Sequence, residues 1–158
     1  MKYIKTFEKK GVSNYDALVD QLFDDIYFGN YQKVLDLIYD RSELVNSTNS
    51  SYEDDSPLLL AINRERYEIA EKLVELGADI NHQNKNNHKT PLMYAGANSY
   101  NMITLLIDAD ADWNIKDSDG KDFFNYLDRL VMKKMVIEDY PEEYEQYLLK
   151  KKEEKYNI

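Results

Sequence analysis

The stretch ELGADINHQNKNNHKTPLMYAGAN, residues 75–98, contains a signal that ends one helix and a signal that begins another. Gly77 follows a run of helix-favouring residues, and glycine adopts the left-handed backbone that closes a helix with little strain. Thr90 supplies an N-cap oxygen, and Pro91 suits the first helical position because its φ is fixed and it has no N–H. The stretch therefore predicts one helix ending near 77, a polar connection, and a second helix starting at 91.

The same two signals recur when the chain is aligned with itself. The segment SPLLLAINRERYEIAEKLVELGADIN (56–81) aligns with TPLMYAGANSYNMITLLIDADADWN (90–114). Pro57 and Pro91 lie 34 positions apart, and Asn81 and Asn114 lie 33 apart. Each copy places apolar residues on one side of two successive helices. A period of this length predicts one supersecondary unit per copy, built from two helices and a tight turn.

The pattern S/T-P-L-x-x-A, followed by I-x-x-x-L-x-x-x-G-A-D-I-N, strongly resembles the ankyrin repeat, whose period is 33 residues and whose signature is T-P-L-H-x-A. The resemblance is specific over 56–122. It implies an all-α fold, a solenoid of stacked antiparallel helix pairs joined by β-turn fingers, with helical N- and C-terminal caps. Repeats this short cannot bury their apolar faces alone, so we expect neighbouring repeats to stack into one continuous core.

Weaker copies flank the two central repeats. Upstream, LFDDIYFGNYQKVLDLIYDRSELVN (22–46) keeps Gly29 at the turn between helices and Asn46 where the central copies have Asn81 and Asn114. Downstream, DSDGKDFFNYLDRL (117–130) keeps an Asp-x-x-Gly finger. We therefore expect a single ankyrin-repeat domain over 1–158, with approximate units 14–46, 56–81, 90–114 and 122–152.

The expected fourth unit differs from the others at its start and at its end. Asp122-Phe123-Phe124 replaces the Thr-Pro-Leu start, and a further helix pair is expected to follow. Asp139 and Pro141 are expected to open the last helix, because a polar cap followed by proline is typical of a helix start. That helix should carry three apolar or aromatic residues on one side: Tyr144, Tyr147 and Leu148.

Several positions depart from the family pattern. The family's His after Thr-Pro-Leu is Leu59 in one central copy and Met93 in the other, so the hydrogen bond from that His to the finger is lost. Asp110 replaces the helix-ending glycine in the third copy, and the turn after Asn98 is one residue shorter. The fingers are longer at 47–55 and at 82–89. We expect local irregularity in the stack at these places.

The composition favours a folded domain without disulfides. With 158 residues and 43% apolar content, the chain can bury one sizeable core. The absence of cysteine excludes disulfides, thiolate metal sites and a cysteine nucleophile. The start has no apolar run of the kind a secretory signal needs, and no window approaches a membrane-spanning length of apolar residues. We therefore expect a cytoplasmic protein that has no membrane partner.

The net charge of −10, from 20 basic and 30 acidic residues, indicates the kind of partner. Nucleic acid is disfavoured, because its phosphates need Lys and Arg for neutralisation. A protein partner with a basic surface is favoured instead. Asp16, Asp20 and Asp24 recur every four residues on the predicted first helix, where unpaired like charges repel one another. Lys150–Lys152 are expected to complement the dipole at the end of the last helix.

Candidate catalytic and metal-binding residues are few. His82 and His88 are the side chains that could act as bases near pH 7, and no Ser or Asp stands at a spacing that suggests a relay. No phosphate-binding glycine loop is present. A calcium loop with Gly120 at its sixth position would begin at Ile115 and end at Tyr126, and neither supplies the needed carboxylate. We expect no enzyme activity, no cofactor and no metal; the Asp clusters at 108–112 and 117–119 are better explained as turn residues bonded to their own backbone.

The family resemblance implies that a partner is recognised by the finger tips and by the exposed ends of the first helices, on the concave side. Tyr27, Phe28, Tyr52 and Arg64 are the strongest candidates, because tyrosine and arginine are enriched at interface hot spots. The full set of expected partner-binding residues is Tyr27, Phe28, Asn63, Arg64 and Asn98 on the helices, and Tyr52, Asp54, Asp55, Asn86, His88 and Lys116 on the fingers.

Three functional hypotheses remain open from the sequence. The first is a non-enzymatic interaction module that binds and blocks, bridges or recruits a protein. The second is a small acidic inhibitor, such as an immunity protein or viral antagonist, that neutralises a basic enzyme; its binding should weaken as salt rises. The third is an enzyme, which turnover lost on changing His82 or His88 to Ala would support. The sequence leaves the identity of the partner and the oligomeric state open.

Overall fold

The computed structural model describes residues 14–127 and 130–156. Over these residues the chain forms eight α-helices and three short 3-10 helices, and this part of the chain contains no named β-strand. The predicted all-α class is therefore confirmed. The α-helices are α1 (Asn14–Phe28), α2 (Tyr31–Asp40), α3 (Pro57–Asn63), α4 (Tyr67–Glu75), α5 (Pro91–Asn98), α6 (Tyr100–Asp108), α7 (Leu130–Asp139) and α8 (Pro141–Tyr156).

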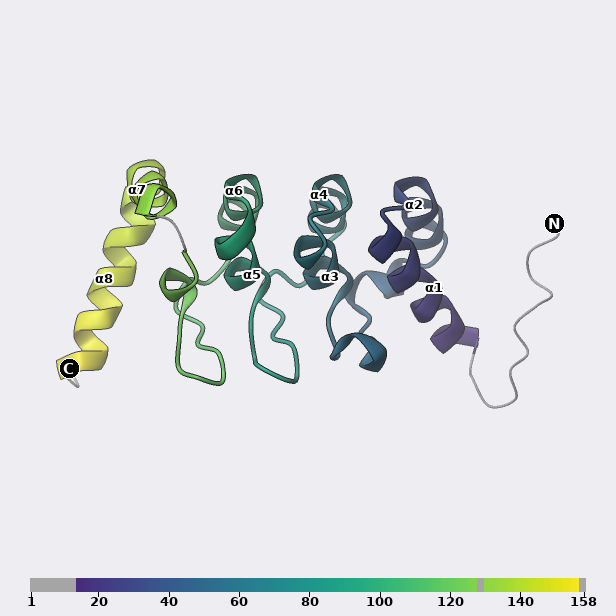
Figure 1. The fold of residues 1–158 in the computed structure, drawn as a ribbon, viewed down its shortest axis with the longest axis horizontal. Helices are drawn as coiled ribbons and strands as arrows, with labels where there is room; N and C mark the ends of the chain where they lie inside the picture. Colours follow the sequence, from purple (N-terminus) through teal and green to yellow (C-terminus); the bar gives the residue numbers. More distant parts are fainter. Residues whose placement is uncertain (1–13, 128–129, 157–158) are drawn as a thin grey trace.

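The helices lie in two layers, with the fingers projecting to one side (Figure 1). Helices α1, α3 and α5 form the layer next to the fingers, and α2, α4 and α6 form the outer layer. Each of the first three pairs packs within itself, and α1 contacts α3, α3 contacts α5, and α4 contacts both α2 and α6. Consecutive hairpins therefore lie side by side, as the repeat pattern predicts. We name the connecting segments finger 1 (47–55), finger 2 (82–89) and finger 3 (115–121).

The predicted start signals act as N-caps. The Ser56 Oγ accepts a hydrogen bond from the Leu59 backbone N–H at 3.2 Å, and the Thr90 Oγ1 accepts one from Met93 at 3.4 Å. Proline follows each cap as the first helical residue. A cap of this kind stabilises a helix by about 1 kcal/mol, so the two central repeats begin where their sequence dictates.

The predicted stop signals adopt left-handed backbone. Gly77 has a φ of +85° after α4, and Asp110 has a φ of 62° at the matching position after α6. Aspartate tolerates this region better than most side chains, which explains why it can replace glycine there. The third repeat therefore keeps the turn geometry of the second despite losing the glycine.

One apolar core runs through the stack from α1 to α7. Leu58, Ala61 and Ile62 of α3 are completely buried, and Leu73 of α4 is equally buried behind them. Burying a leucine or isoleucine in full stabilises the fold by about 1.5–3 kcal/mol. Leu59 and Met93, which stand where the family has histidine, are also buried, at 0% and 1% exposure. Apolar packing thus replaces the lost histidine hydrogen bond.

Asparagines at matching positions hydrogen-bond neighbouring repeats to one another. The Asn46 side chain donates to the Gly77 carbonyl oxygen at 3.1 Å and accepts from the Asp79 backbone N–H at 2.8 Å. The Asn81 side chain accepts from the Asp112 backbone N–H at 2.9 Å in the next repeat. The aligned asparagines of the sequence therefore belong to one recurring contact between units.

The expected further helix pair is present as α7 and α8, and α8 begins at Pro141 as predicted, but the segment before this pair differs from the earlier repeats. A single 3-10 turn, Phe123–Asn125, stands where the earlier repeats have a full first helix, and it contacts α5. Helix α8 then extends from α7 along finger 3 (Figure 1). Of the three residues expected on one side of this helix, Tyr144 and Tyr147 pack against the core, whereas Leu148 is 40% exposed.

Candidate protein-binding surface

Three elements bring the strongest sequence candidates together near the N-terminal end of the stack. Tyr27 and Phe28 are the last residues of α1, Tyr52 belongs to finger 1, and Arg64 directly follows α3. The Arg64 guanidinium lies 4.1 Å from the centre of the Tyr27 ring, a cation–π contact. The Tyr27 ring lies 5.2 Å from Phe28 and 6.3 Å from Tyr52, centre to centre. We call these four residues the aromatic platform.

Contacts with the core and with Arg66 hold the platform in place, whereas one of its rings faces solvent. Tyr52 packs on the buried ring of Phe23 at 5.3 Å, which ties finger 1 to the core. The Arg66 guanidinium donates to the Tyr27 carbonyl oxygen at 2.8 Å and fixes the end of α1. Phe28, by contrast, is 69% exposed, the most exposed of the large hydrophobic residues that the structure describes. The platform is therefore preorganised, and one of its rings is largely exposed to solvent.

Carboxylates of α1 lie beside the platform and bond to finger 1. The Asp24 carboxylate accepts from the Tyr52 hydroxyl at 3.0 Å, and the Asp20 carboxylate accepts from the Asn49 side chain at 2.9 Å. Burial and then the hydrogen bond to Asp24 raise the pKa of Tyr52. Acidic residues spaced four apart on α1 are thus satisfied by the finger, which offsets the repulsion expected between them.

The tips of fingers 1 and 2 meet around a polar hollow of 470 Å³. Asp54, His82, Lys85 and His88 are among the residues that line it. The Lys85 ammonium lies 3.3 Å from the Asp54 carboxylate, and His82 Nε2 donates to the Asp54 carbonyl oxygen at 3.1 Å. Two of the sequence candidates, Asp54 and His88, therefore share one hollow between neighbouring fingers.

Asp55 is not available as a contact residue, so this prediction was wrong. It is 5% exposed and accepts a hydrogen bond from the Asn84 side chain at 3.2 Å, and Asn84 is itself fully buried. Burial raises the pKa of Asp55 to about 6, although the hydrogen bond from Asn84 opposes that rise. Its role is to join fingers 1 and 2 from inside, which a sequence of consecutive acidic residues does not reveal.

The remaining candidates are spread over the fingers and helix ends. Asn63 is exposed at the end of α3, next to Arg64, and Asn86 is exposed on finger 2. Asn98 ends α5, but its side chain lies outside the described residues. Only Asn63 among these three is adjacent in sequence to the aromatic platform.

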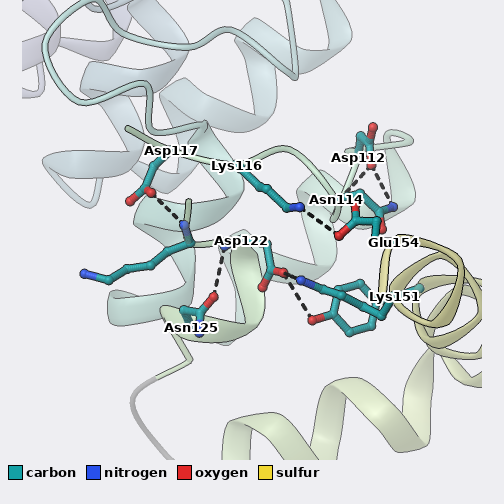
Figure 2. A network of polar contacts seen from close by, with 10 residues as sticks. Asp112, Asn114, Lys116, Asp117, Asp122, Asn125, Lys151 and Glu154 are labelled. Atoms are coloured by element: carbon teal, nitrogen blue, oxygen red, sulfur yellow. Dashed lines mark hydrogen bonds and ion pairs between the residues drawn. The ribbon is translucent and has the colours of Figure 1, made fainter. Parts of the chain in front are cut away.

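Lys116 is exposed but occupied by a contact with α8. Figure 2 shows its ammonium pointing from finger 3 toward Glu154, and the two charged groups lie 2.7 Å apart. The hydrogen bond from Lys116 lowers the pKa of Glu154. One helical turn earlier, the Lys151 ammonium lies 2.5 Å from the Asp122 carboxylate (Figure 2). Two ion pairs thus hold α8 against the finger 3 region. In one of them α8 supplies the carboxylate, and in the other it supplies the ammonium.

This network corrects the interpretation of the lysines at 150–152. Helix α8 continues to Tyr156, so these residues do not form its last turn. Lys151 instead faces Asp122, whose carboxylate also accepts from the Tyr147 hydroxyl at 3.3 Å. In the sequence, the signal for this contact is that Asp122 stands where the central repeats have Ser or Thr. Its partner, Lys151, lies 29 positions away on α8.

The acidic clusters are explained by local turns. The Asp112 carboxylate accepts from the Asn114 backbone N–H at 2.8 Å, and the Asp117 carboxylate accepts from Asp119 at 2.9 Å and Lys121 at 2.8 Å. Burial opposes ionisation of Asp117, but these bonds and one from the Tyr126 hydroxyl leave its pKa below the ordinary value. Within the described ranges, no group of three or more His, Cys, Asp or Glu residues is placed to hold a metal ion.

A comparison with protein-family models finds a match to ankyrin repeats in three copies, over residues 22–117. The chain belongs to the ankyrin repeat family. Ankyrin repeats are generally protein-interaction modules, and the family is typically non-enzymatic. The matched range includes both central repeats, the aromatic platform and all of fingers 1 and 2.

One curated protein is similar to part of this chain. The transient receptor potential cation channel subfamily A member 1 of Homo sapiens is 33% identical over 84 residues, which is 52% of this chain. The match spans 7% of the length of that protein, so the likeness to this ankyrin chain is confined to a short region of the relative. Among the helices of the described residues, none is both long and apolar enough to cross a membrane.

Proposed function

We propose that this ankyrin chain binds another protein through the aromatic platform and the tips of fingers 1 and 2. Binding alone, without catalysis, then blocks, bridges or recruits that protein. The observation that carries the proposal is the platform itself: Arg64 stacked on Tyr27, with the neighbouring Phe28 left 69% exposed. Exposed rings held in place by rigid elements lose little conformational entropy on binding, which favours a hot spot.

The charge around the platform supports a partner with a basic surface. Asp20, Asp24 and Glu53 are exposed on α1 and finger 1, and the chain carries a net charge of −10. These three carboxylates outnumber the Arg64 guanidinium, which keeps its positive charge in its contact with the Tyr27 ring. A partner that presents an apolar side chain together with Lys or Arg would satisfy both parts of this surface.

Paired variants on the two helix layers test the proposal. Phe28→Ala and a triple Tyr27→Ala, Tyr52→Ala, Arg64→Ala variant are compared with Tyr39→Ala on the outer helix α2, where Tyr39 is 61% exposed. Affinity purification from the native cell, quantified by mass spectrometry, should show partners that the platform variants lose and that Tyr39→Ala retains. Unchanged partner recovery with the triple variant would refute the proposed surface. Circular dichroism of each variant separates lost binding from lost folding.

The second candidate is a small inhibitor of a basic enzyme, and the carboxylates that frame the platform favour it. For this function we expect the association rate with the purified partner to fall more than about tenfold between about 50 and 500 mM NaCl, because charge steering is screened. An association rate that barely responds to salt indicates apolar docking and removes the inhibitor hypothesis in its charge-driven form.

A further inference from the structure

A second hollow lies near the opposite end of the molecule, between α8 and the loop that follows α6. Its volume is 540 Å³, which is within the range of sites that hold a small ligand or a few side chains. Its base is formed by Ile107, Ala111 and Trp113, which belong to the core and are exposed by 4–7%. We call this hollow the α8 groove. It is separate from the aromatic platform, which lies at the α1 end of the stack (Figure 1).

One wall of the α8 groove presents an aliphatic side chain without a place in the core. Leu149 lines the groove and is 53% exposed. Helix α8 packs against the core through Tyr144 and Tyr147 and has no fully buried residue among those described. The groove therefore combines the buried apolar floor of the third repeat with the exposed side chain of Leu149. The other aliphatic residue of α8, Leu148, does not line the groove.

The rim of the α8 groove is acidic. Asp110 and Asp112 contribute carboxylates from the loop after α6, and Glu143 and Glu153 contribute them from α8. The basic residue among the lining side chains is Lys150. Asp112 lies near α8 in Figure 2, and all four acidic residues line the same hollow. Four carboxylates against one ammonium make the rim attractive to positive charge at neutral pH.

We propose that the α8 groove docks a segment of another protein that presents one or two aliphatic side chains flanked by lysine or arginine. The aliphatic group would cover Leu149 and the floor, and the flanking cations would pair with the carboxylates of the rim. Apolar contact supplies affinity and charge complementarity supplies orientation in such a site. This inference does not depend on the aromatic platform, because the two surfaces share no residue.

The position of the single tryptophan provides a direct reporter of docking. The chain has one Trp, Trp113, and it lies at the floor of the α8 groove. The probe is the blocked synthetic peptide Lys-Lys-Leu-Leu-Lys-Lys, titrated into the full chain while Trp113 emission is recorded. We expect a saturable emission change. The peptides Lys-Lys-Gly-Gly-Lys-Lys and Glu-Glu-Leu-Leu-Glu-Glu, which lack the aliphatic or the basic part, should produce at most a weak, non-saturating change.

Matched variants separate the groove from the general acidity of α8. Leu149→Ser and the double variant Glu143→Gln, Glu153→Gln should each weaken peptide binding about fivefold to tenfold. Leu148→Ser and Glu145→Gln, at exposed positions that do not line the groove, should leave binding within about twofold of the original chain.

Three results would overturn the inference. The first is no saturable change with the basic leucine peptide, and the second is equal binding of the acidic peptide. The third is a dimer of the chain in sedimentation that Leu149→Ser dissociates, because a second copy would then be the occupant of the groove. All changed residues are exposed, so circular dichroism and the urea midpoint are expected to match those of the unchanged chain.

Discussion

The Lys151 ammonium lies 2.5 Å from the carboxylate of Asp122, and the Asp122 side chain is only 3% exposed. Removing the lysine would leave a buried carboxylate without its charged partner. Because the Lys151 side chain is 35% exposed, solvent reduces the cost. We expect Lys151→Met to lower the free energy of unfolding by about 1–3 kcal/mol in urea denaturation.

Two further variants isolate the ion pair as the cause. Lys152→Met, at an exposed neighbouring position, should change stability by less than about 0.5 kcal/mol. Adding Asp122→Asn to Lys151→Met should restore part of the loss, because the buried charge is then gone. Equal destabilisation by Lys151→Met and Lys152→Met would show that the contact with Asp122 contributes nothing.

Asp55 should make stability depend on pH in an unusual direction for an acid. Burial raises its pKa to about 6 in the folded state, so its protonated form is favoured there. The stability that it contributes is complete below its unfolded pKa near 4 and is lost as pH rises through about 6. Asp55→Asn changes the free energy of unfolding at each pH. We expect this change to be about 2 kcal/mol more favourable to the folded state at pH 7.5 than at pH 4.

Urea titrations of the unchanged chain and of Asp55→Asn at the two pH values measure this difference. The asparagine keeps an oxygen that can accept the hydrogen bond from Asn84, so the contact between fingers 1 and 2 is preserved. Asp54→Asn is the control, since Asp54 is less buried than its neighbour. A pH-independent effect of Asp55→Asn would contradict the prediction.

Asn46 should contribute to coupling between the first two repeats. Its side chain bonds to the Gly77 carbonyl and to the Asp79 N–H, and all three groups are on exposed residues where water can replace the lost partner. We expect Asn46→Ala to cost about 1–2 kcal/mol, whereas Asn86→Ala on the tip of finger 2 should cost less than about 0.5 kcal/mol. Hydrogen exchange of the Asp79 amide, faster in Asn46→Ala only, would report the loss locally.

Gly96 should be a packing requirement and not a flexible position. A Cβ built there would lie 3.2 Å from the Tyr126 carbonyl oxygen and 3.3 Å from the Phe123 ring. Alanine is favoured over glycine in a helix by about 1 kcal/mol, but the collision with backbone in the next unit should outweigh this gain. We expect Gly96→Ala to lower the unfolding temperature. Ala97→Gly, at an exposed neighbour, measures the helix preference alone, and a rise in stability of Gly96→Ala would disprove close packing.

The start and stop of each central repeat could be predicted because they depend on local chemistry. The Thr90 oxygen caps the helix three residues away, and the backbone at Gly77 is set by its own lack of a side chain. Periodic apolar residues then fix which side of each helix is buried. The same reasoning places Tyr27 and Arg64 at equivalent surface ends of α1 and α3, and their contact follows from the stacking of those helices.

The errors occurred where the environment of a residue is set by a distant segment. Asp55 resembles Asp54 in sequence, but Asn84 of the next finger buries it. Lys151 resembles a helix-end lysine, but Asp122 of the finger 3 region pairs with it. The role of α8 was missed for the same reason, since its polar sequence carries no repeat signal. The unit boundaries and the partner-binding roles of the exposed residues stay predictions.

The asparagine contacts between repeats have a consequence for how the chain folds. The side chains of Asn46 and Asn81 accept hydrogen bonds from the backbone N–H groups of Asp79 and Asp112 in the next units, 33 and 31 positions away. Each new unit therefore needs closure of a short loop onto its neighbour, and no step requires the two ends of the chain to meet. The refolding rate should accordingly be close to that of helical bundles, and nucleation could begin at either central repeat and spread outward.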